Sequence, residues 1–309
     1  MISTSLKFWG VRGSIPTPGP ETVGIGGNTS CVEVRVGKEI IILDAGTGIR
    51  PLGLSLAKEF AGVPMNLTLL ISHTHWDHIQ GFPFFMPVYS PANKVHIRGY
   101  EGARARFSSI LLAQMESPYF PVEMTRLPAN IDIEELKEFD FHVGDIPVRA
   151  KLLNHPGVCA GYRIETPGGA IAYLPDNEPQ VHLRKIQQRR GVEVSAETMA
   201  RSERNDADLV EFIRGAKVLI IDSHYTSEEY PHHMAWGHAD AETVTRIAME
   251  AGVERLFLFH HNPEHDDAQV AAKAKACQKV AKGSGLIVEA AVEGASLKWS
   301  SPAKIYSRV

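Results

Sequence analysis

The sequence predicts an α/β fold in which short buried strands alternate with amphipathic helices. Apolar runs bounded by turn residues recur along the chain, as at 67–71 and 218–221, and such runs are typical of buried strands. Between them lie stretches with helical periodicity, clearest at 241–251, where the apolar residues share one face. Side chains suited to metal binding or acid–base chemistry follow four of the buried runs within two residues. These three observations predict a strand-rich core with one functional edge.

The N-terminal half is expected to alternate strands with two helices. A first strand begins at Phe8 and breaks into a loop rich in glycine and proline that continues to Gly27. Alternating or apolar runs predict further strands at 28–36, 38–43, 67–71 and 95–98. Helices are expected at 50–60 and 103–115.

The C-terminal half is expected to hold further strands and helices around one segment of different composition. Two or three strands are predicted between 125 and 153, followed by a hairpin at 161–174 with a Pro-Gly-Gly turn. Strands and helices then alternate at 218–221, 241–251, 256–259, 267–281 and 286–291, and the last of these is the final expected strand. Residues 177–214 are polar and charged. We interpret them as a helical insertion within a single domain that spans residues 1–309.

Composition and charge are those of an ordinary globular protein. Hydrophobic residues make up 44% and charged residues 22% of the chain, and the net charge is −4. No apolar run approaches the roughly 20 residues of a membrane-spanning helix, and the N-terminus lacks the pattern of a signal peptide. Three widely spaced cysteines, Cys31, Cys159 and Cys277, fit a reducing compartment. We therefore expect a cytoplasmic protein without a membrane partner, and the charge does not favour nucleic acid as a partner.

The segment 73–78, His-Thr-His-Trp-Asp-His, supplies four metal-ligand side chains within six residues. Alternation in an extended chain puts His73 and His75 on the same side. Asp77 and His78 come next, where the chain turns, and can face a second point. Imidazole and carboxylate groups are the ligands that zinc and similar ions prefer. The segment therefore predicts a centre of two divalent ions, with zinc favoured and manganese or iron as alternatives.

Four of the buried runs end in a metal-ligand or acid–base residue: His73, Asp176, Asp222 and His260. In α/β proteins, functional groups gather outside the carboxyl ends of the strands, so these side chains are expected on one rim. Strand alternation leaves open whether His260 or its neighbour His261 points toward that rim.

Two further residues are candidates for the same rim. Asp44 follows the run 38–43, and it either orients a metal-binding histidine or is satisfied by backbone N–H groups in its own turn. The sequence leaves both roles open. His224 lies two residues after Asp222, a position from which it could line the same pocket.

In this order, the residues resemble the metallo-β-lactamase superfamily. The match runs from about Phe8 to Ala291 and leaves 177–214 outside, and its most specific mark is the HxHxDH segment at 73–78. The resemblance implies an αββα sandwich, in which two mixed β-sheets lie face to face with helices outside. It also implies a ligand set in which Asp176 bridges the two ions; one ion is held by His73, His75 and His155, and the other by Asp77, His78 and His260. On the resemblance alone, His260 is preferred over His261.

Later segments resemble the phosphodiesterase branch of that superfamily, which includes tRNase Z and some cyclic-nucleotide phosphodiesterases. The resemblance lies in 154–165 and in 236–263. This resemblance implies that His238 and Asp222 act at the scissile phosphate. We also expect Asp77 to be a catalytic residue as well as a metal ligand. The chain departs from tRNase Z at 222–226, where Asp-Ser-His-Tyr-Thr replaces a Glu-Ala-Thr signature, and it lacks a Gly/Pro-rich arm.

We therefore expect a metal-dependent hydrolase, a phosphodiesterase that acts on a small phosphodiester such as a cyclic nucleotide. His238, held near Asp222, is expected to protonate the leaving alkoxide, because an imidazole titrates near neutral pH.

Three alternatives remain open. They are a tRNase Z-like endonuclease for RNA 3′ ends, a lactone, β-lactam or thioester hydrolase, and a non-enzymatic di-iron sensor or binding protein. Charge and the missing arm disfavour RNA, and His75 disfavours the di-iron protein, because redox relatives usually place Glu there. Residues 177–214 are expected to cover the site or to reach a partner subunit in a homodimer.

Overall fold

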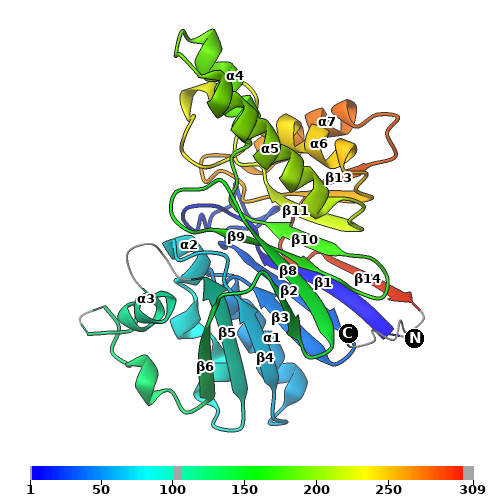
Figure 1. Ribbon diagram of the computed structural model, residues 1–309. Helices are drawn as coiled ribbons and strands as arrows, with labels where there is room; N and C mark the ends of the chain where they lie inside the picture. The colour runs from blue at the N-terminus through cyan, green and yellow to red at the C-terminus, as the bar shows by residue number, and fades with distance from the viewer. Residues whose placement is uncertain (1, 101–105, 118, 302–309) are drawn as a thin grey trace.

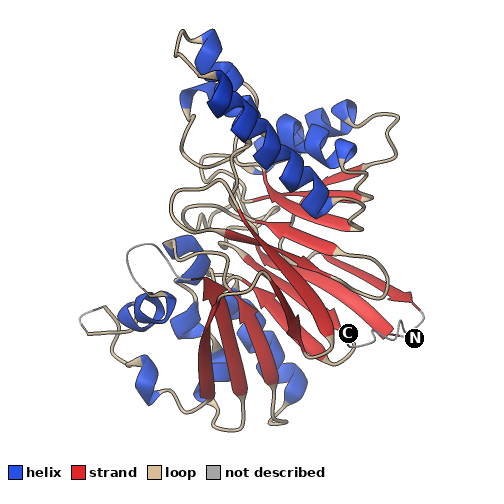
Figure 2. Cartoon of the chain, viewed as in Figure 1, coloured by secondary structure: helices blue, strands red, loops and turns tan. Residues whose placement is uncertain are grey.

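Two seven-stranded β-sheets pack face to face and carry helices on their outer faces (Figure 1, Figure 2). The computed structural model describes residues 2–100, 106–117 and 119–301. Both sheets are mixed, with parallel and antiparallel pairs. This arrangement is an αββα sandwich, so the predicted fold class is confirmed.

The first sheet has the strand order β14-β1-β2-β3-β4-β5-β6. Strands β3 to β6 run parallel, whereas the pairs at the other edge are antiparallel. The bounds are β1 (Ile2–Gly10), β2 (Cys31–Val36), β3 (Glu39–Leu43), β4 (Asn66–Leu70), β5 (Lys94–Tyr100), β6 (Asn130–Leu136) and β14 (Ser296–Ser301).

Two strands at the edge of this sheet differ from the sequence prediction. β1 begins at Ile2 rather than at Phe8, and the segment 286–291 is not the last strand, because β14 follows it. The polar composition of β14 gives no strand signal of its own. It becomes a strand because the edge of β1 offers backbone partners, with Leu297 opposite Leu6 and packed against the core.

The second sheet has the order β13-β12-β11-β10-β9-β8-β7. Strands β10 to β13 are parallel, and β7 to β10 are antiparallel. The bounds are β7 (Asp140–Val143), β8 (Ile146–Leu152), β9 (Ala160–Ile164), β10 (Ile171–Leu174), β11 (Val218–Asp222), β12 (Arg255–Phe259) and β13 (Ile287–Ala290).

The helices predicted at 50–60, 241–251 and 267–281 agree with the structure to within a residue. The helices of the described residues are α1 (Ile49–Phe60), α2 (Trp76–Ile79), α3 (Phe107–Ala113), α4 (Gln180–Arg189), α5 (Ala196–Ile213), α6 (Ala241–Glu250) and α7 (Asp267–Val280). Four short 3-10 helices are η1 (Phe82–Phe84), η2 (Met86–Tyr89), η3 (Met124–Arg126) and η4 (Tyr230–His232). The first residues of the helix expected at 103–115, 103–105, lie outside the described residues. None of the described helices is long and apolar enough to cross a membrane.

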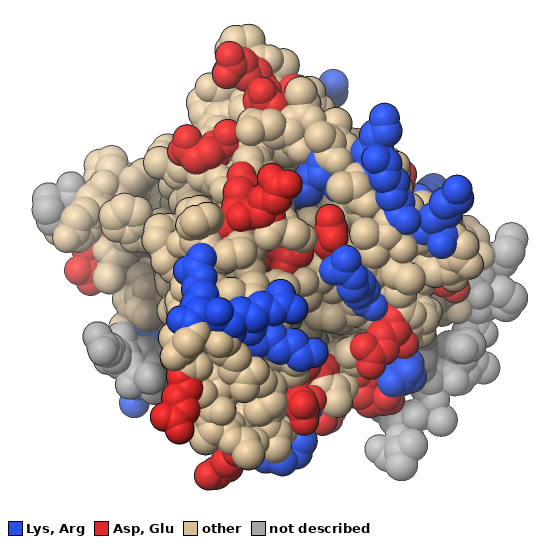
Figure 3. Space-filling model, turned by 90° about the horizontal axis from the view of Figure 1, so that it is seen from above, with Lys and Arg blue, Asp and Glu red and all other residues tan. Residues whose placement is uncertain are grey.

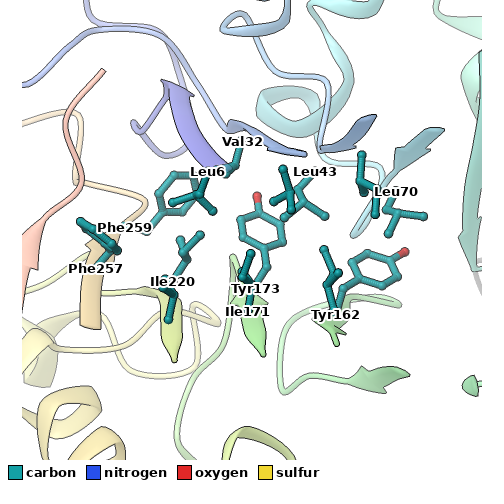
Figure 4. Close-up of a cluster of buried hydrophobic side chains, with 14 of the residues drawn as sticks. Leu6, Val32, Leu43, Leu70, Tyr162, Ile171, Tyr173, Ile220, Phe257 and Phe259 are labelled. Carbon is teal, nitrogen blue, oxygen red and sulfur yellow. The ribbon is translucent and has the colours of Figure 1, made fainter. Parts of the chain in front are cut away.

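Three apolar clusters hold the layers together. The central cluster lies between the two sheets, where Leu6, Val32, Leu43 and Leu70 face side chains of the second sheet such as Tyr173 (Figure 4). A second cluster joins the first sheet to α1 and α3, and a third joins the second sheet to α5, α6 and α7. Each fully buried aliphatic side chain contributes roughly 1.5–3 kcal/mol to folding, so the sandwich is a rigid support for the loops at its edge.

Residues 177–214, interpreted as a helical insertion, contain α4 and α5, which project together beyond the sheets (Figure 1). Ser195 caps α5 through its hydroxyl group, and Asp206 on α5 accepts hydrogen bonds from the first backbone N–H groups of α4. The last turns of α5 behave differently. Leu209, Val210 and Ile213 belong to the apolar cluster under the second sheet, so this end of α5 is part of the outer helix layer.

Candidate active site

The loops after β3, β4, β8, β10, β11 and β12 bring their polar side chains to one place. The described residues contain three clusters whose ligand atoms lie close enough to hold a metal ion: His73, His75, His155 and Asp176; Asp77, His78 and His260; and Asp222, His224, His238 and His260. All seven side chains predicted as ligands are members, as are His238 and Asp222. The rim expected from the strand ends is therefore present, and the individual roles remain predictions.

Asp176 lies between the two groups of predicted ligands and turns one oxygen toward each. Its Oδ2 is 3.6 Å from Nε2 of His73 and 3.6 Å from Nε2 of His155. Its Oδ1 is 3.2 Å from Nε2 of His78 and 3.4 Å from Nε2 of His260. This is the arrangement that a bridging carboxylate requires.

The other carboxylate, Asp77, serves one side only. Its Oδ2 is 3.1 Å from Nε2 of His78 and 3.0 Å from Nε2 of His260, and it accepts the backbone N–H of Ser14 at 2.8 Å. His260 has a φ of 55°, a left-handed conformation that is rare for a residue with a side chain. Its neighbour His261 lies away from the cluster, with Nε2 donating to the carbonyl oxygen of Ala291 at 2.9 Å. The structure thus places His260, not His261, at the rim.

Asp44 orients two of the histidines, the first of the two roles left open for it. The fully buried carboxylate accepts the Nδ1–H of His78 at 2.8 Å and the hydroxyl groups of Tyr173 at 2.7 Å and Ser72 at 2.8 Å. Because the Ser72 hydroxyl donates to Asp44, it accepts from Nδ1 of His73, 3.0 Å away. Both histidines are therefore held with Nδ1 protonated and Nε2 free to bind a cation.

His155 is oriented in the same way by a backbone group. Its Nδ1 donates to the carbonyl oxygen of Gly237 at 2.9 Å, and its Nε2 lies 3.0 Å from Nδ1 of His75. Gly237 has a φ of 87°, and a Cβ added there would lie 2.4 Å from Nδ1 of His155. Glycine is needed at this position both for the backbone conformation and for the close approach.

The predicted ligand set fits a cationic centre. Nε2 of His73, Nε2 of His78 and Oδ1 of Asp176 are buried without a hydrogen-bond partner among the described residues. Such groups are costly in a protein interior unless a cation pairs with them. Burial opposes the charged form of His78, but Asp77, Asp176 and Asp44 outweigh it and raise the pKa of this imidazole. The same negative charge attracts a divalent ion, so two ions held by these residues would satisfy the orphaned atoms.

His238 and Asp222 form a pair beside Asp176, the predicted bridging carboxylate. Nδ1 of His238 donates to Oδ2 of Asp222 at 2.8 Å and is 4.0 Å from Oδ2 of Asp176. Burial disfavours the imidazolium, but the carboxylates, above all Asp222, outweigh it and raise the pKa of His238 to about 9. Asp222 is itself held by the backbone N–H groups of Asn177 and His224. The predicted pair is thus in contact and next to the predicted ligands.

Two residues have a larger place in the site than the sequence indicated. His224 stacks on His238 with ring centroids 4.7 Å apart, and its Nδ1 donates to the carbonyl oxygen of His260 at 3.0 Å. Glu178 accepts hydrogen bonds from the hydroxyl of Tyr230 at 2.6 Å, the N–H of Ala235 at 2.8 Å and the N–H of Gly237 at 3.2 Å. Glu178 falls in the segment interpreted as the insertion. The only feature of the sequence that pointed to it is that a carboxylate stands two residues after Asp176.

The comparisons with known proteins agree with this geometry. A family model described as the β-lactamase superfamily domain matches residues 40–261. Ribonuclease Z from Thermoplasma acidophilum is 26% identical over 290 residues, which cover 86% of this chain and 88% of that protein.

Two solved structures share the fold. The metallo-β-lactamase fold protein YhfI from Bacillus subtilis has a TM-score of 0.64 and 18% identity, covering 96% of this chain and 100% of that one. A diphosphatase of the PhnP family has a TM-score of 0.64 and 14% identity, covering 97% of this chain and 100% of that one. Because the family model covers well over half of the chain, the chain belongs to the metallo-β-lactamase superfamily of metal-dependent hydrolases.

Proposed function

We propose that this hydrolase is a phosphodiesterase whose leaving oxygen is protonated by His238. The observation that carries the proposal is the contact between His238 and Asp222, 2.8 Å long, beside Asp176, the predicted bridging ligand. Hydrolysis of a phosphodiester needs neutralisation of the phosphate charge, a nucleophile at neutral pH and a proton for the leaving alkoxide. Two divalent ions held by the predicted ligands would supply Lewis acidity for the first two needs. The third need falls to a side chain.

The geometry of the pair suits a proton donor. Asp222 accepts the Nδ1–H of His238, which fixes the ring and leaves Nε2 as the atom that can meet a substrate oxygen. The side chain of Asp222 is fully buried, whereas that of His238 is 12% exposed, so the imidazole reaches the surface and the carboxylate does not. An alkoxide such as a ribose oxygen is a poor leaving group without a proton, so this donor suits the hydrolysis of a nucleoside phosphodiester.

For the substrate class, the relatives reverse the order that the sequence suggested. The sequence analysis put a cyclic nucleotide ahead of RNA, but relatives that align over most of the chain are named ribonuclease Z. We therefore take an RNA phosphodiester as the first candidate. The face seen from above in Figure 3 bears a band of Lys and Arg side chains flanked by Asp and Glu, and such a band can approach a phosphate backbone.

A small phosphodiester remains the second candidate. The specific observations in its favour are the altered segment at 222–226 and the lack of a Gly/Pro-rich arm that would grip a tRNA. If this candidate holds, cyclic nucleotides will be hydrolysed efficiently while structured RNA is not.

The test is a hydrolysis screen on protein loaded with zinc or manganese. The substrates are a hairpin RNA with a 3′ extension, a 2′,3′- and a 3′,5′-cyclic nucleotide, bis-p-nitrophenyl phosphate, a lactone and the β-lactam nitrocefin. We expect turnover of bis-p-nitrophenyl phosphate and of at least one nucleotide substrate, with cleavage of the RNA at the start of its extension. Hydrolysis of the lactone or nitrocefin without any phosphodiester turnover would contradict the proposal.

A further inference from the structure

We propose that Trp76 and Trp236 stack nucleobases at the mouth of the active site, so that the site selects phosphodiesters carrying bases. The inference rests on the proposed phosphodiesterase function and adds to it the recognition of the substrate. It concerns two side chains with no role in the ligand set or in proton transfer.

The two indoles are exposed to a degree that sets them apart from the other tryptophans. Trp76 is 81% exposed and Trp236 is 62% exposed. Trp9 and Trp299 pack against apolar clusters, whereas Trp76 and Trp236 belong to none of the clusters among the described residues. Their large apolar surfaces therefore contribute little to the fold, and a bound ligand is what would cover them.

Both indoles lie next to residues of the site. Trp76 lies between His75 and Asp77, and His75 is the exposed member of its metal-ligand cluster, so this segment borders the opening to solvent. Trp236 directly precedes Gly237, whose carbonyl oxygen accepts the hydrogen bond from His155. The rings of His75 and His155 are 4.9 Å apart, so the segments that carry the two tryptophans meet at the same histidine pair.

The Trp236 ring is supported from behind by an aromatic column. It meets His233 edge to face at 5.1 Å, and His233 stacks on the buried Tyr225 at 4.5 Å with an interplanar angle of 13°. Tyr225 in turn meets His224 at 4.7 Å, inside the site. These contacts hold the Trp236 ring in place, and the exposed face of that ring remains open for a ligand.

The backbone holds Trp236 outward at a conformational cost. Ala235 has a φ of 67°, a strained value for alanine, and its N–H donates to the buried carboxylate of Glu178. Gly237 on the other side also donates to Glu178. The exposed indole is thus at the tip of a turn whose two flanking residues both donate hydrogen bonds to Glu178. Its position is therefore preorganised.

Aromatic rings beside a phosphodiester site match the chemistry of nucleotides. Base stacking on an aromatic side chain is sequence-tolerant and changes affinity by roughly 5- to 150-fold per base. A phosphodiester without bases gains nothing from such rings. The two indoles would then hold the bases on either side of the scissile phosphate.

The experiment compares two esters with the same leaving group, thymidine 5′-(p-nitrophenyl phosphate) and methyl p-nitrophenyl phosphate. The variants are Trp76→Leu and Trp236→Leu, with Trp76→Phe and Trp236→Phe as conservative replacements and Phe139→Leu as an exposed aromatic control before the edge strand β7. The thymidine ester carries one base, which can stack on one of the two indoles, so we expect the leucine variant at that position to raise KM for this ester by at least about 5-fold. If neither leucine variant raises this KM, the inference is overturned. The methyl ester shares the p-nitrophenyl ring but has no base, so its KM should change much less, and phenylalanine should restore most of the affinity for the thymidine ester.

A binding measurement separates failure of this inference from failure of the phosphodiesterase proposal. Adenosine 5′-monophosphate should quench the tryptophan fluorescence of the wild type, and the quenching should shrink in the leucine variants but not in Phe139→Leu. Absence of hydrolysis of both esters would contradict the phosphodiesterase proposal, and the quenching would still decide the role of the rings. Equal effects of a leucine variant on both esters would overturn the inference, and so would unchanged quenching. A changed oligomeric mass with unchanged kinetics would also overturn it, because it would indicate that the rings bind a protein partner.

Discussion

His155 and His238 show how neighbouring imidazoles acquire different roles. Each uses Nδ1 to donate a hydrogen bond, but the acceptor is a neutral carbonyl oxygen for His155 and the Asp222 carboxylate for His238. A carboxylate stabilises the imidazolium, whereas a carbonyl oxygen mainly fixes the tautomer. Nε2 of His155 faces His75 and Asp176. His155 is therefore suited to bind a metal ion and His238 to carry a proton.

The first prediction concerns His238→Ala. Because His238 lies outside the ligand set, the variant should keep two divalent ions per chain, while phosphodiester hydrolysis slows by roughly 10²–10⁴-fold, the usual range for general acid catalysis. The loss should be much smaller for a p-nitrophenolate leaving group, which needs no proton, than for a ribose oxygen. Steady-state kinetics with both leaving groups and metal analysis check this.

His232→Ala is the matched control, because His232 is exposed in η4 and has no contact in the site. Its kinetics should equal those of the wild type. Equal losses for both leaving groups in His238→Ala would remove His238 from the role of acid, and a loss of metal would place it among the ligands.

The second prediction concerns the two carboxylates of the centre. Asp176 turns an oxygen to each side, so Asp176→Ala should lose binding of both ions. Asp77 contacts only His78 and His260, so Asp77→Ala should lose one ion and keep the other. Metal content by mass spectrometry after dialysis gives the stoichiometry. Two ions retained in Asp176→Ala would contradict the bridging role.

At the scale of elements, the loop between η4 and α6 is held by one buried carboxylate. Glu178 accepts from Tyr230, Ala235 and Gly237, and Gly237 is followed by His238. In Glu178→Gln the amide nitrogen cannot accept the N–H of Gly237, and two donors would face each other. We expect kcat to fall on the order of 10- to 100-fold through misplacement of His238, with both ions retained.

Glu228→Gln is the control for this third prediction, because Glu228 is exposed in the turn just before η4. It should leave kcat unchanged. A Glu178→Gln variant with full kcat would show that the loop keeps its position without the carboxylate.

The fourth prediction concerns the exposed end of the α4–α5 pair. Residues 189–196 are largely exposed, while Leu209 and Ile213 at the other end of α5 belong to the core. Replacing 189–196 by a short glycine linker should therefore leave the fold intact. Because the segment is expected to cover the site or to reach a partner subunit, the replacement should change either the affinity for substrate or the oligomeric mass. Light scattering and substrate titration measure the two. A variant unchanged in both would make the tip a passive connection.

Elements whose apolar residues repeat regularly were predictable from sequence. Each exception has a physical cause. The buried strands β4, β11 and β12 and the amphipathic helix α6 agree with the prediction to within a residue or two. β14 was missed because its stability comes from pairing with β1, a contact distant in sequence. The bounds of α5 within the helical segment 177–214 were not predicted, because its first half is largely exposed and carries no apolar stripe.

At the scale of the whole molecule, the site lies across both sheets. His73 and His78 follow β4 in the first sheet, whereas Asp176 and His260 follow strands of the second. The sequence indicated these residues through the strand ends and the resemblance, but not how they are joined. The bond from Tyr173 to Asp44, which links the sheets behind the site, joins residues 129 positions apart and has no signature in the sequence.

The fifth prediction uses Lys273 on α7 as a probe of this packing. The buried ammonium group donates to the carbonyl oxygens of Ser223 and His224, at 2.7 and 3.1 Å, and so ties the outer helix layer to the end of β11. Burial lowers the pKa of Lys273 from 10.5 to about 8. Between these values the unfolded chain binds more protons than the folded one, so this group makes the free energy of unfolding rise with pH.

The experiment measures the free energy of unfolding of the wild type and of Lys273→Met. Both are unfolded by denaturant at a fixed metal concentration, from pH 8 to pH 10. The free energy of unfolding of the wild type should rise relative to the variant by roughly 2 kcal/mol over this range. The difference between the two proteins cancels the titration of tyrosines and other groups that both contain. A difference independent of pH would mean that Lys273 titrates as an exposed lysine does, and that water reaches the junction between α7 and β11.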